Sequence, residues 1–107
     1  MANTYKSLGQ ANPGAVLTAL YTVPAATAAI GWLTISNKEN AANTCRVKHA
    51  PAGAADDPDH DILYDFVIPA NDTYIHPVPL YMAATDVVRV YGSDTNVTFT
   101  MSGVEIT

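Results

Sequence analysis

Seven prolines and six glycines punctuate this chain and mark the corners between its segments. The intervening stretches are rich in β-branched and aromatic residues, which favour extended backbone. Turn signals recur roughly every 8–14 residues, a spacing typical of all-β folds. The pattern predicts a two-sheet β-sandwich of immunoglobulin-like or jelly-roll type with about eight short antiparallel strands, and a small barrel is the alternative.

The length and composition indicate one folded unit. The 107 residues are close to the commonest domain size and are sufficient for one modest core. Hydrophobic residues make up 49% of the chain and charged residues only 14%, which excludes a disordered protein. We therefore expect a single β-sandwich domain over residues 1–107.

Runs of apolar and β-branched residues mark the strands. Cys45 and Val47 share one face of a strand whose other face carries Arg46 and Lys48, so this strand is predicted to be half-buried with a solvated side. In the last strand the apolar parity changes at Ser102–Gly103, where a glycine bulge is expected. The predicted strands cover residues 4–8, 16–23, 28–36, 44–50, 62–68, 73–77, 86–92 and 96–107.

The segment 28–36 is the most apolar of these strands. Ile30 and Trp32 point to one side and Leu33 and Ile35 to the other, which predicts a central strand covered on both faces. Trp32 is then a core residue, and Trp32→Ala is expected to cost about 3–5 kcal/mol.

The net charge of −5 limits the classes of partner. The five cationic residues are scattered, so the clustered basic face that nucleic acids or an anionic membrane would need is not expected. Residues 15–35 are uncharged over about the length of a membrane span, but Pro24 and Gly31 interrupt them. This run is interpreted as two strands and a turn, and the first ten residues lack the apolar core of a signal peptide.

The stretch DDPDHD, residues 56–61, holds four of the ten acidic residues and one of the three histidines. Its candidate metal ligands are Asp57, Asp59 and Asp61, but Pro58 falls within the run and no glycine or closing glutamate follows it, as a calcium loop requires. The favoured interpretation is an acidic hairpin loop that caps its own backbone. No metal and no cofactor are expected, and replacing the aspartates by asparagine should leave thermal stability unchanged.

Catalytic patterns are missing from the sequence. It contains no GxSxG motif and no glycine-rich phosphate loop. Glu39 and Glu105 are its only glutamates, and the single cysteine, Cys45, is expected to be a small buried hydrophobic residue. The chain is therefore predicted not to be an enzyme.

Two segments are candidate protein interfaces. PVPLYM, residues 77–82, contains two prolines that disfavour regular strand pairing, and it concentrates apolar side chains. The favoured interpretation of this segment is a crossover loop folded back onto the core, and an intersubunit contact is the alternative. The second candidate is the acidic loop, which can present a negatively charged projection to a basic partner. The interface candidates are Val78, Leu80, Tyr81, Met82, Asp56, Asp57 and Asp59.

Five segments, taken together and in order, carry a resemblance to a known family. The chain resembles a family of tailed-bacteriophage virion proteins of about this size, and the resemblance spans nearly all of it. Residues 38–43 and 54–61 match no fixed pattern, which places DDPDHD among the variable loops. The segments are YKSLGQANPGAVLTALYTVPAAT, LTISNKENAANTCRVKHAPAGA, ILYDFVIPANDTYI, AATDVVRVYGSD and VTFTMSGVEIT.

The resemblance implies a structural role with no catalytic residues. The expected protein is made in the bacterial cytoplasm and assembles into the virion in many symmetric copies, in contact with capsid or tail proteins. Capsid decoration or cement, and a tail, baseplate, collar or fibre component, are the expected positions. The alternative function is a carbohydrate- or receptor-binding module of a fibre, lined by Trp32, the tyrosines and the acidic loop; a buried Trp32 would argue against it.

Overall fold

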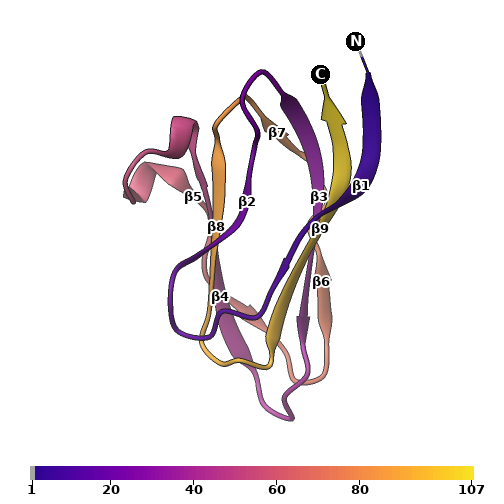
Figure 1. Cartoon of the computed structure of the whole chain (residues 1–107). Coiled ribbons are helices and arrows are strands. Elements are labelled where there is room, and N and C mark those ends of the chain that lie inside the picture. Colours follow the sequence, from indigo (N-terminus) through magenta and orange to yellow (C-terminus); the bar gives the residue numbers. More distant parts are fainter. Residues whose placement is uncertain (1) are drawn as a thin grey trace.

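The computed structural model describes residues 2–107 as two antiparallel β-sheets packed face to face (Figure 1). The five-stranded sheet has the order β1 (Asn3–Ala11), β9 (Val97–Ile106), β3 (Ala28–Asn37) and β6 (Thr73–Ile75), with β7 (Leu80–Met82) also paired to β3. The four-stranded sheet has the order β2 (Thr18–Thr22), β8 (Val87–Gly92), β4 (Asn43–Ala50) and β5 (Asp61–Ile68). The 3₁₀ turns Pro51–Gly53 and Pro58–His60 lie between β4 and β5. The predicted β-sandwich is confirmed.

Strand pairing is nested along the chain. The strand β1 pairs with β9, β2 with β8, β3 with β6, and β4 with β5. This is the pattern of one long hairpin, with its tip between β4 and β5, rolled over so that successive pairs alternate between the two sheets. Of the two sandwich types that the sequence allowed, the nested order is that of a jelly roll.

The core lies between the two sheets. Leu33, Ile35, Phe99, Val47 and Val90 are fully buried there and supply the inward positions of four strands. The inward positions alternate with outward ones along each strand, as the strand period of two requires.

The prediction for Cys45 is confirmed. Its side chain is completely buried in the core, and burial raises the pKa of its thiol to about 12. A thiol with so high a pKa carries almost no thiolate at neutral pH.

Trp32 does not lie in the core, and the prediction that β3 is covered on both faces is wrong. Only one face of β3 is buried, and Trp32 points outward with half of its surface exposed. The strand is central because it hydrogen-bonds to neighbours on both sides, not because both faces are covered. Apolar residues on both faces of a strand also arise when the outer face is an interaction surface.

The glycine bulge expected at Ser102–Gly103 is not present. Register between β3 and β9 runs without a shift from one end of the pair to the other, and Gly103 lies opposite Gly31. The irregularity is in β1 instead, between Ser7 and Gly9. The change of parity in β9 therefore places Val104 on the outward face of the sheet.

A ninth strand lies where strand pairing was not expected. Leu80–Met82 forms β7, which pairs with residues 29–31 of β3 beyond the two prolines. The prolines separate β6 from β7, so β3 has two short partners along one edge. The uncharged run 15–35 forms β2, a turn and the first part of β3, as predicted. The described chain has no helix of the length and apolar character that a membrane span needs.

Candidate functional site

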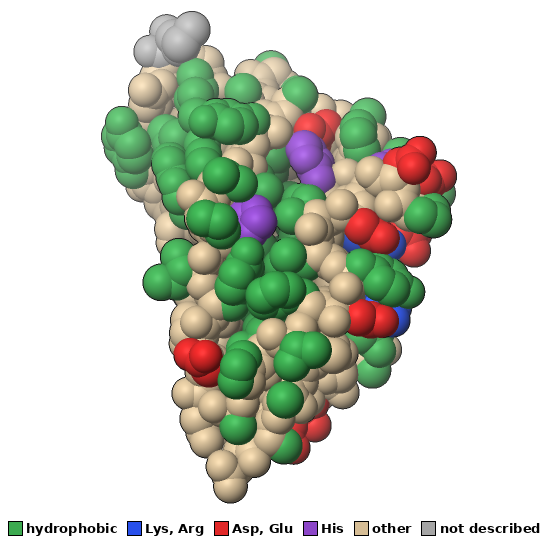
Figure 2. All heavy atoms as spheres, turned by 180° about the vertical axis from the view of Figure 1, so that it is seen from behind, with side chains coloured by type: hydrophobic (Ala, Val, Ile, Leu, Met, Phe, Trp, Pro, Cys, Tyr) green, Lys and Arg blue, Asp and Glu red, His purple; other side chains and the backbone are tan. Residues whose placement is uncertain are grey.

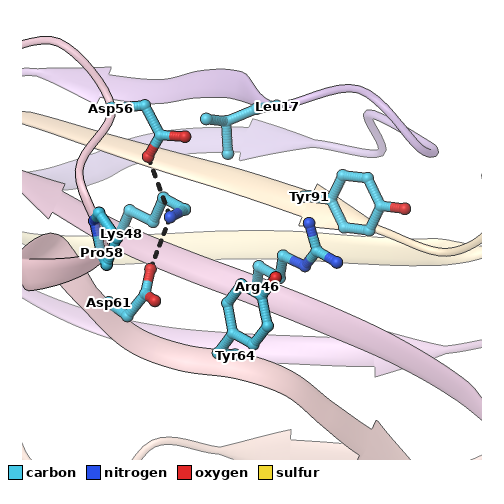
Figure 3. Close-up of a pocket in the computed structure, with 8 residues that line it drawn as sticks. All are labelled: Leu17, Arg46, Lys48, Asp56, Pro58, Asp61, Tyr64 and Tyr91. Atoms are coloured by element: carbon cyan, nitrogen blue, oxygen red, sulfur yellow. Dashed lines mark ion pairs between the residues drawn. The ribbon is translucent and has the colours of Figure 1, made fainter.

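The acidic loop folds back onto the outward face of the four-stranded sheet (Figure 3). Asp61 and Asp56 place carboxylate oxygens 2.6 Å and 2.9 Å from Lys48 Nζ. The hydrogen bond to Asp61, and after it the bond to Asp56, raise the pKa of Lys48. The bond from Lys48 in turn lowers the pKa of Asp56. Lys48 is consequently buried, with 7% of its surface exposed, and the predicted solvated position of this residue is wrong.

Arg46 lies next to this ion pair, between two aromatic rings. In Figure 3 the guanidinium group lies between the rings of Tyr64 and Tyr91. Its carbon is 4.4 Å from the ring centre of Tyr64 and 4.5 Å from that of Tyr91. Arg46 Nε donates a hydrogen bond to Asp65 at 2.7 Å, which raises the pKa of the guanidinium. Cation–π contacts on both sides hold the planar group in one orientation.

These residues line a groove of about 480 Å³. The aromatic and cationic side chains come from β4, β5 and β8, and the acidic loop closes one side. The volume lies in the range of small-ligand sites. The lining residues are Leu17, Arg46, Lys48, Asp56, Pro58, Asp61, Tyr64 and Tyr91.

The structure separates the three candidate metal ligands of the loop. Asp57 caps the 3₁₀ turn by accepting a hydrogen bond from the Asp59 N–H at 2.9 Å, as predicted for a self-capping loop. Asp59 itself is exposed, and Asp61 pairs with Lys48. Within residues 2–107, no three histidine, cysteine or acidic side chains come together in a group that could hold a metal ion.

The ion pair with Lys48 means that the expected lack of effect on stability does not extend to Asp61, so the loop aspartates should differ. Asp61→Asn removes the closest carboxylate from a buried ammonium group and should lower the free energy of unfolding by up to about 1 kcal/mol, or roughly 4–8 °C in Tm. Asp59→Asn should leave Tm unchanged. Circular dichroism recorded during thermal unfolding measures Tm for the two variants. Equal Tm values would contradict the assigned ion pair.

The outward face of the five-stranded sheet has a different character. Outward positions of β3 and the residues paired with them include no aspartate, glutamate, lysine or arginine. We call this surface the uncharged face. It consists of Asn3, Tyr5, Ser7, Gln10, Ala28, Ile30, Trp32, Thr34, Ser36, Thr73, Ile75, Tyr81, Thr98, Thr100, Ser102, Val104 and Ile106.

A row of apolar side chains crosses the uncharged face. Tyr5 lies opposite Val104, Val104 opposite Ile30, and Ile30 opposite Tyr81. Tyr5 is 79% and Tyr81 71% exposed, whereas Val104 is buried within the row. In Figure 2, hydrophobic side chains gather at the upper left and most carboxylates lie toward the right.

The candidate interface in residues 77–82 is divided by the strand period. Val78 and Tyr81 are exposed, so both stay available to a partner. Leu80 and Met82 are buried in the core, and their prediction as interface residues is wrong. The cause is that β7 pairs with β3, which turns alternate side chains inward.

Two buried polar links escaped prediction because each joins residues distant in the sequence. Asp86 accepts hydrogen bonds from the N–H groups of Ala52 and Ala83, both at 2.9 Å, and lies 2.8 Å from His49 Nε2. Burial opposes ionisation of Asp86, but these hydrogen bonds outweigh it and lower the pKa of the carboxyl group.

The second link joins the two sheets. Glu105 accepts a hydrogen bond from the Tyr21 hydroxyl, and Lys6 Nζ lies 2.9 Å from the other carboxylate oxygen of Glu105. Burial first, and then the bond to Glu105, raise the pKa of Tyr21 well above its ordinary value. The hydrogen bonds from Tyr21 and Lys6 lower the pKa of Glu105. Both links are made within the fold and tie segments that are distant in the sequence.

Comparison of the chain with protein-family models, with curated proteins and with solved structures gave no match.

Proposed function

We propose that this chain is a non-enzymatic structural component of a tailed-bacteriophage virion, assembled in multiple symmetric copies on the particle. The observation that carries the proposal is the uncharged face, which exposes Tyr5, Trp32, Ile75 and Tyr81 on one side of a rigid sheet. Monomeric soluble proteins rarely leave large apolar patches exposed unless a partner covers them. The collinear sequence segments support the virion assignment, and jelly rolls are common in capsid proteins, which is support by analogy only.

The size of the uncharged face suits a stable contact. The exposed parts of Tyr5, Trp32 and Tyr81 amount to roughly 400 Å² of aromatic surface. Strands spaced about 4.8 Å apart and rising about 3.3 Å per residue give the face a projected area of roughly 600 Å². A standard interface buries about 800 Å² of accessible surface per partner. Because the accessible area of a surface exceeds its projected area, the uncharged face is large enough for an interface of this size.

The charge distribution favours a second copy of the chain as the occupant of this face. A net charge of −5 makes copies repel each other wherever their acidic surfaces meet. The uncharged face lets two copies approach without that repulsion, and aromatic residues are typical of such contacts. Contacts of this kind serve a capsid decoration or cement protein, and they serve a tail, baseplate, collar or fibre component equally. In either position the acidic surfaces face other virion proteins.

Self-association gives the first test. The purified protein should form a discrete oligomer in light scattering coupled to size exclusion, and the double variant Trp32→Lys/Tyr81→Lys should be a folded monomer. Because Trp32 is half-exposed, its replacement should cost the isolated fold about 1 kcal/mol or less. Val67→Lys is the matched control, since Val67 is 56% exposed on the other sheet.

A wild-type protein that stays monomeric over the accessible concentration range would contradict assembly through this face. An oligomer that dissociates equally in the Val67→Lys control would contradict the assigned surface. Antibody labelling of purified particles tests the virion role separately, because it shows whether the protein is on the particle and whether it lies on the capsid or the tail.

A further inference from the structure

The groove on the four-stranded sheet lies on the side of the sandwich away from the uncharged face, and assembly through that face leaves it open. From its lining we infer that the groove is a binding site for a neutral saccharide, such as one or two sugar units of a cell-surface glycan. The inference goes beyond the structural role and does not depend on it. Of the residues that the sequence offered as a glycan-binding surface, Tyr64, Tyr91 and the acidic loop meet here, whereas Trp32, Tyr5 and Tyr81 lie on the other sheet.

The hydrogen-bonding groups of the groove are of both kinds. The bond from Arg46 to Asp65 uses Nε, which leaves the two Nη groups as donors. Lys48 has three donor hydrogens, and its ion pairs with Asp56 and Asp61 employ two of them. Each of these carboxylates holds Lys48 through one oxygen, and in Figure 3 the second oxygen of each points away from the ammonium group and keeps acceptor capacity.

This mixture selects the class of ligand. An anionic ligand would meet Asp56 and Asp61, a cationic one would meet Arg46 and Lys48, and an apolar one would cover charged groups without replacing their hydration. Neighbouring sugar hydroxyls each donate and accept hydrogen bonds, so they match closely spaced donors and acceptors. Hydrogen bonds from these hydroxyls are stronger here because every protein partner is charged.

The aromatic residues supply the remaining element of a sugar site. Tyr64 is 57% exposed, and Arg46 stacks on its ring and on that of Tyr91, so both rings are fixed in place. An apolar face of a pyranose ring packs on such a surface, while its hydroxyl groups reach the charged side chains beside it. Fixed aromatic residues cost little conformational entropy when a ligand binds.

Titration of the full chain with methyl glycosides of glucose, galactose, mannose and N-acetylglucosamine tests the site by NMR chemical-shift perturbation. At concentrations up to about 20 mM, above a weak Kd of about 1 mM, at least one glycoside should shift the amides of the groove. Tyr64→Ala and Arg46→Ala should each raise Kd about tenfold or more. Tyr5→Ala is the control, since Tyr5 is an exposed tyrosine on the opposite sheet and its loss should leave Kd unchanged.

Thermal unfolding of each variant checks that the fold is kept. If Tyr64→Ala does not fold, Tyr64→Leu takes its place in the titration. The inference is overturned if no neutral glycoside shifts the groove, if the shifts lie elsewhere, or if only an acidic sugar such as N-acetylneuraminic acid binds. The oligomeric state is measured on the same samples, so failure of the saccharide site and failure of the assembly role give different results.

Discussion

Replacing Asp86 by alanine is expected to lower the free energy of unfolding by about 3–5 kcal/mol. The carboxylate is buried and holds three parts of the chain: the turn after β4 through Ala52, the turn before β8 through Ala83, and β4 itself through His49. Alanine leaves both backbone N–H groups without an acceptor. A hydrogen bond to a charged group contributes about 1.5–3 kcal/mol, and here two are lost together.

Chemical denaturation measures this loss, and Asp59→Ala is the control because Asp59 is an exposed aspartate in the loop. Asp86→Asn should fall between the two, since the amide retains one acceptor oxygen. Equal midpoints for Asp86→Ala and Asp59→Ala would show that the three contacts contribute nothing to folding.

The same carboxylate makes stability depend on pH. Although burial opposes its ionisation, hydrogen bonding lowers the pKa of Asp86 in the folded protein below the value of about 3.9 in the unfolded chain. Its contribution is therefore fully present above pH 4 and is lost as the pH falls through the folded value. Asp86→Asn should remove this part of the acid dependence.

Gly103→Ala is expected to cost about 3 kcal/mol or more. A methyl group at this position would lie 2.0 Å from the carbonyl oxygen of Ile30 and 2.9 Å from the Gly31 Cα, in the centre of the β3–β9 pair. Both neighbours are backbone atoms of a central strand, so they cannot move without disturbing the pairing on each side. The outward row that includes Val104 and Ile30 would be displaced with them.

Gly31→Ala provides the comparison within the same strand pair. Its added methyl group would meet mainly the Met101 side chain, at 2.5 Å from the sulfur, and a methionine side chain can change rotamer. Unfolding midpoints should therefore fall further for Gly103→Ala than for Gly31→Ala. The reverse order would show that the two strands do not approach as closely as the structure has them.

The parts of the fold that were predictable from the sequence rest on local signals. Proline and glycine positions located the corners, and the alternation of Cys45 and Val47 correctly identified the inward face of β4. The same alternation misplaced Lys48, since it cannot show that a later loop supplies Asp61 and covers the outward face. Trp32 was misplaced for a related reason, because apolar residues on both faces do not reveal which face is covered.

The candidate sites were less predictable because they depend on register between distant segments. Arg46, Tyr64 and Tyr91 come from three strands, and only their pairing brings the rings to either side of the guanidinium. Asp86 lies just before β8 with no motif around it, and two of its three partners, Ala52 and His49, lie 34 and 37 positions earlier in the chain. The sequence pointed to the tyrosines and the acidic loop as one lining, but only the strand pairing shows that Tyr64 and Tyr91 join the loop and the other tyrosines do not.

The nested pairing of the strands sets the order in which this protein can be completed during synthesis. The partner of β1 is β9, so residues 3–11 wait without a hydrogen-bonding partner until residues 97–106 have left the ribosome. At about 5–20 residues per second this delay lasts roughly 5–20 s. The β4–β5 hairpin, which also carries Arg46 and Tyr64 of the groove, is the first pair that can form. The uncharged face includes residues of β1 and β9 and is therefore the last part of this sandwich that can form.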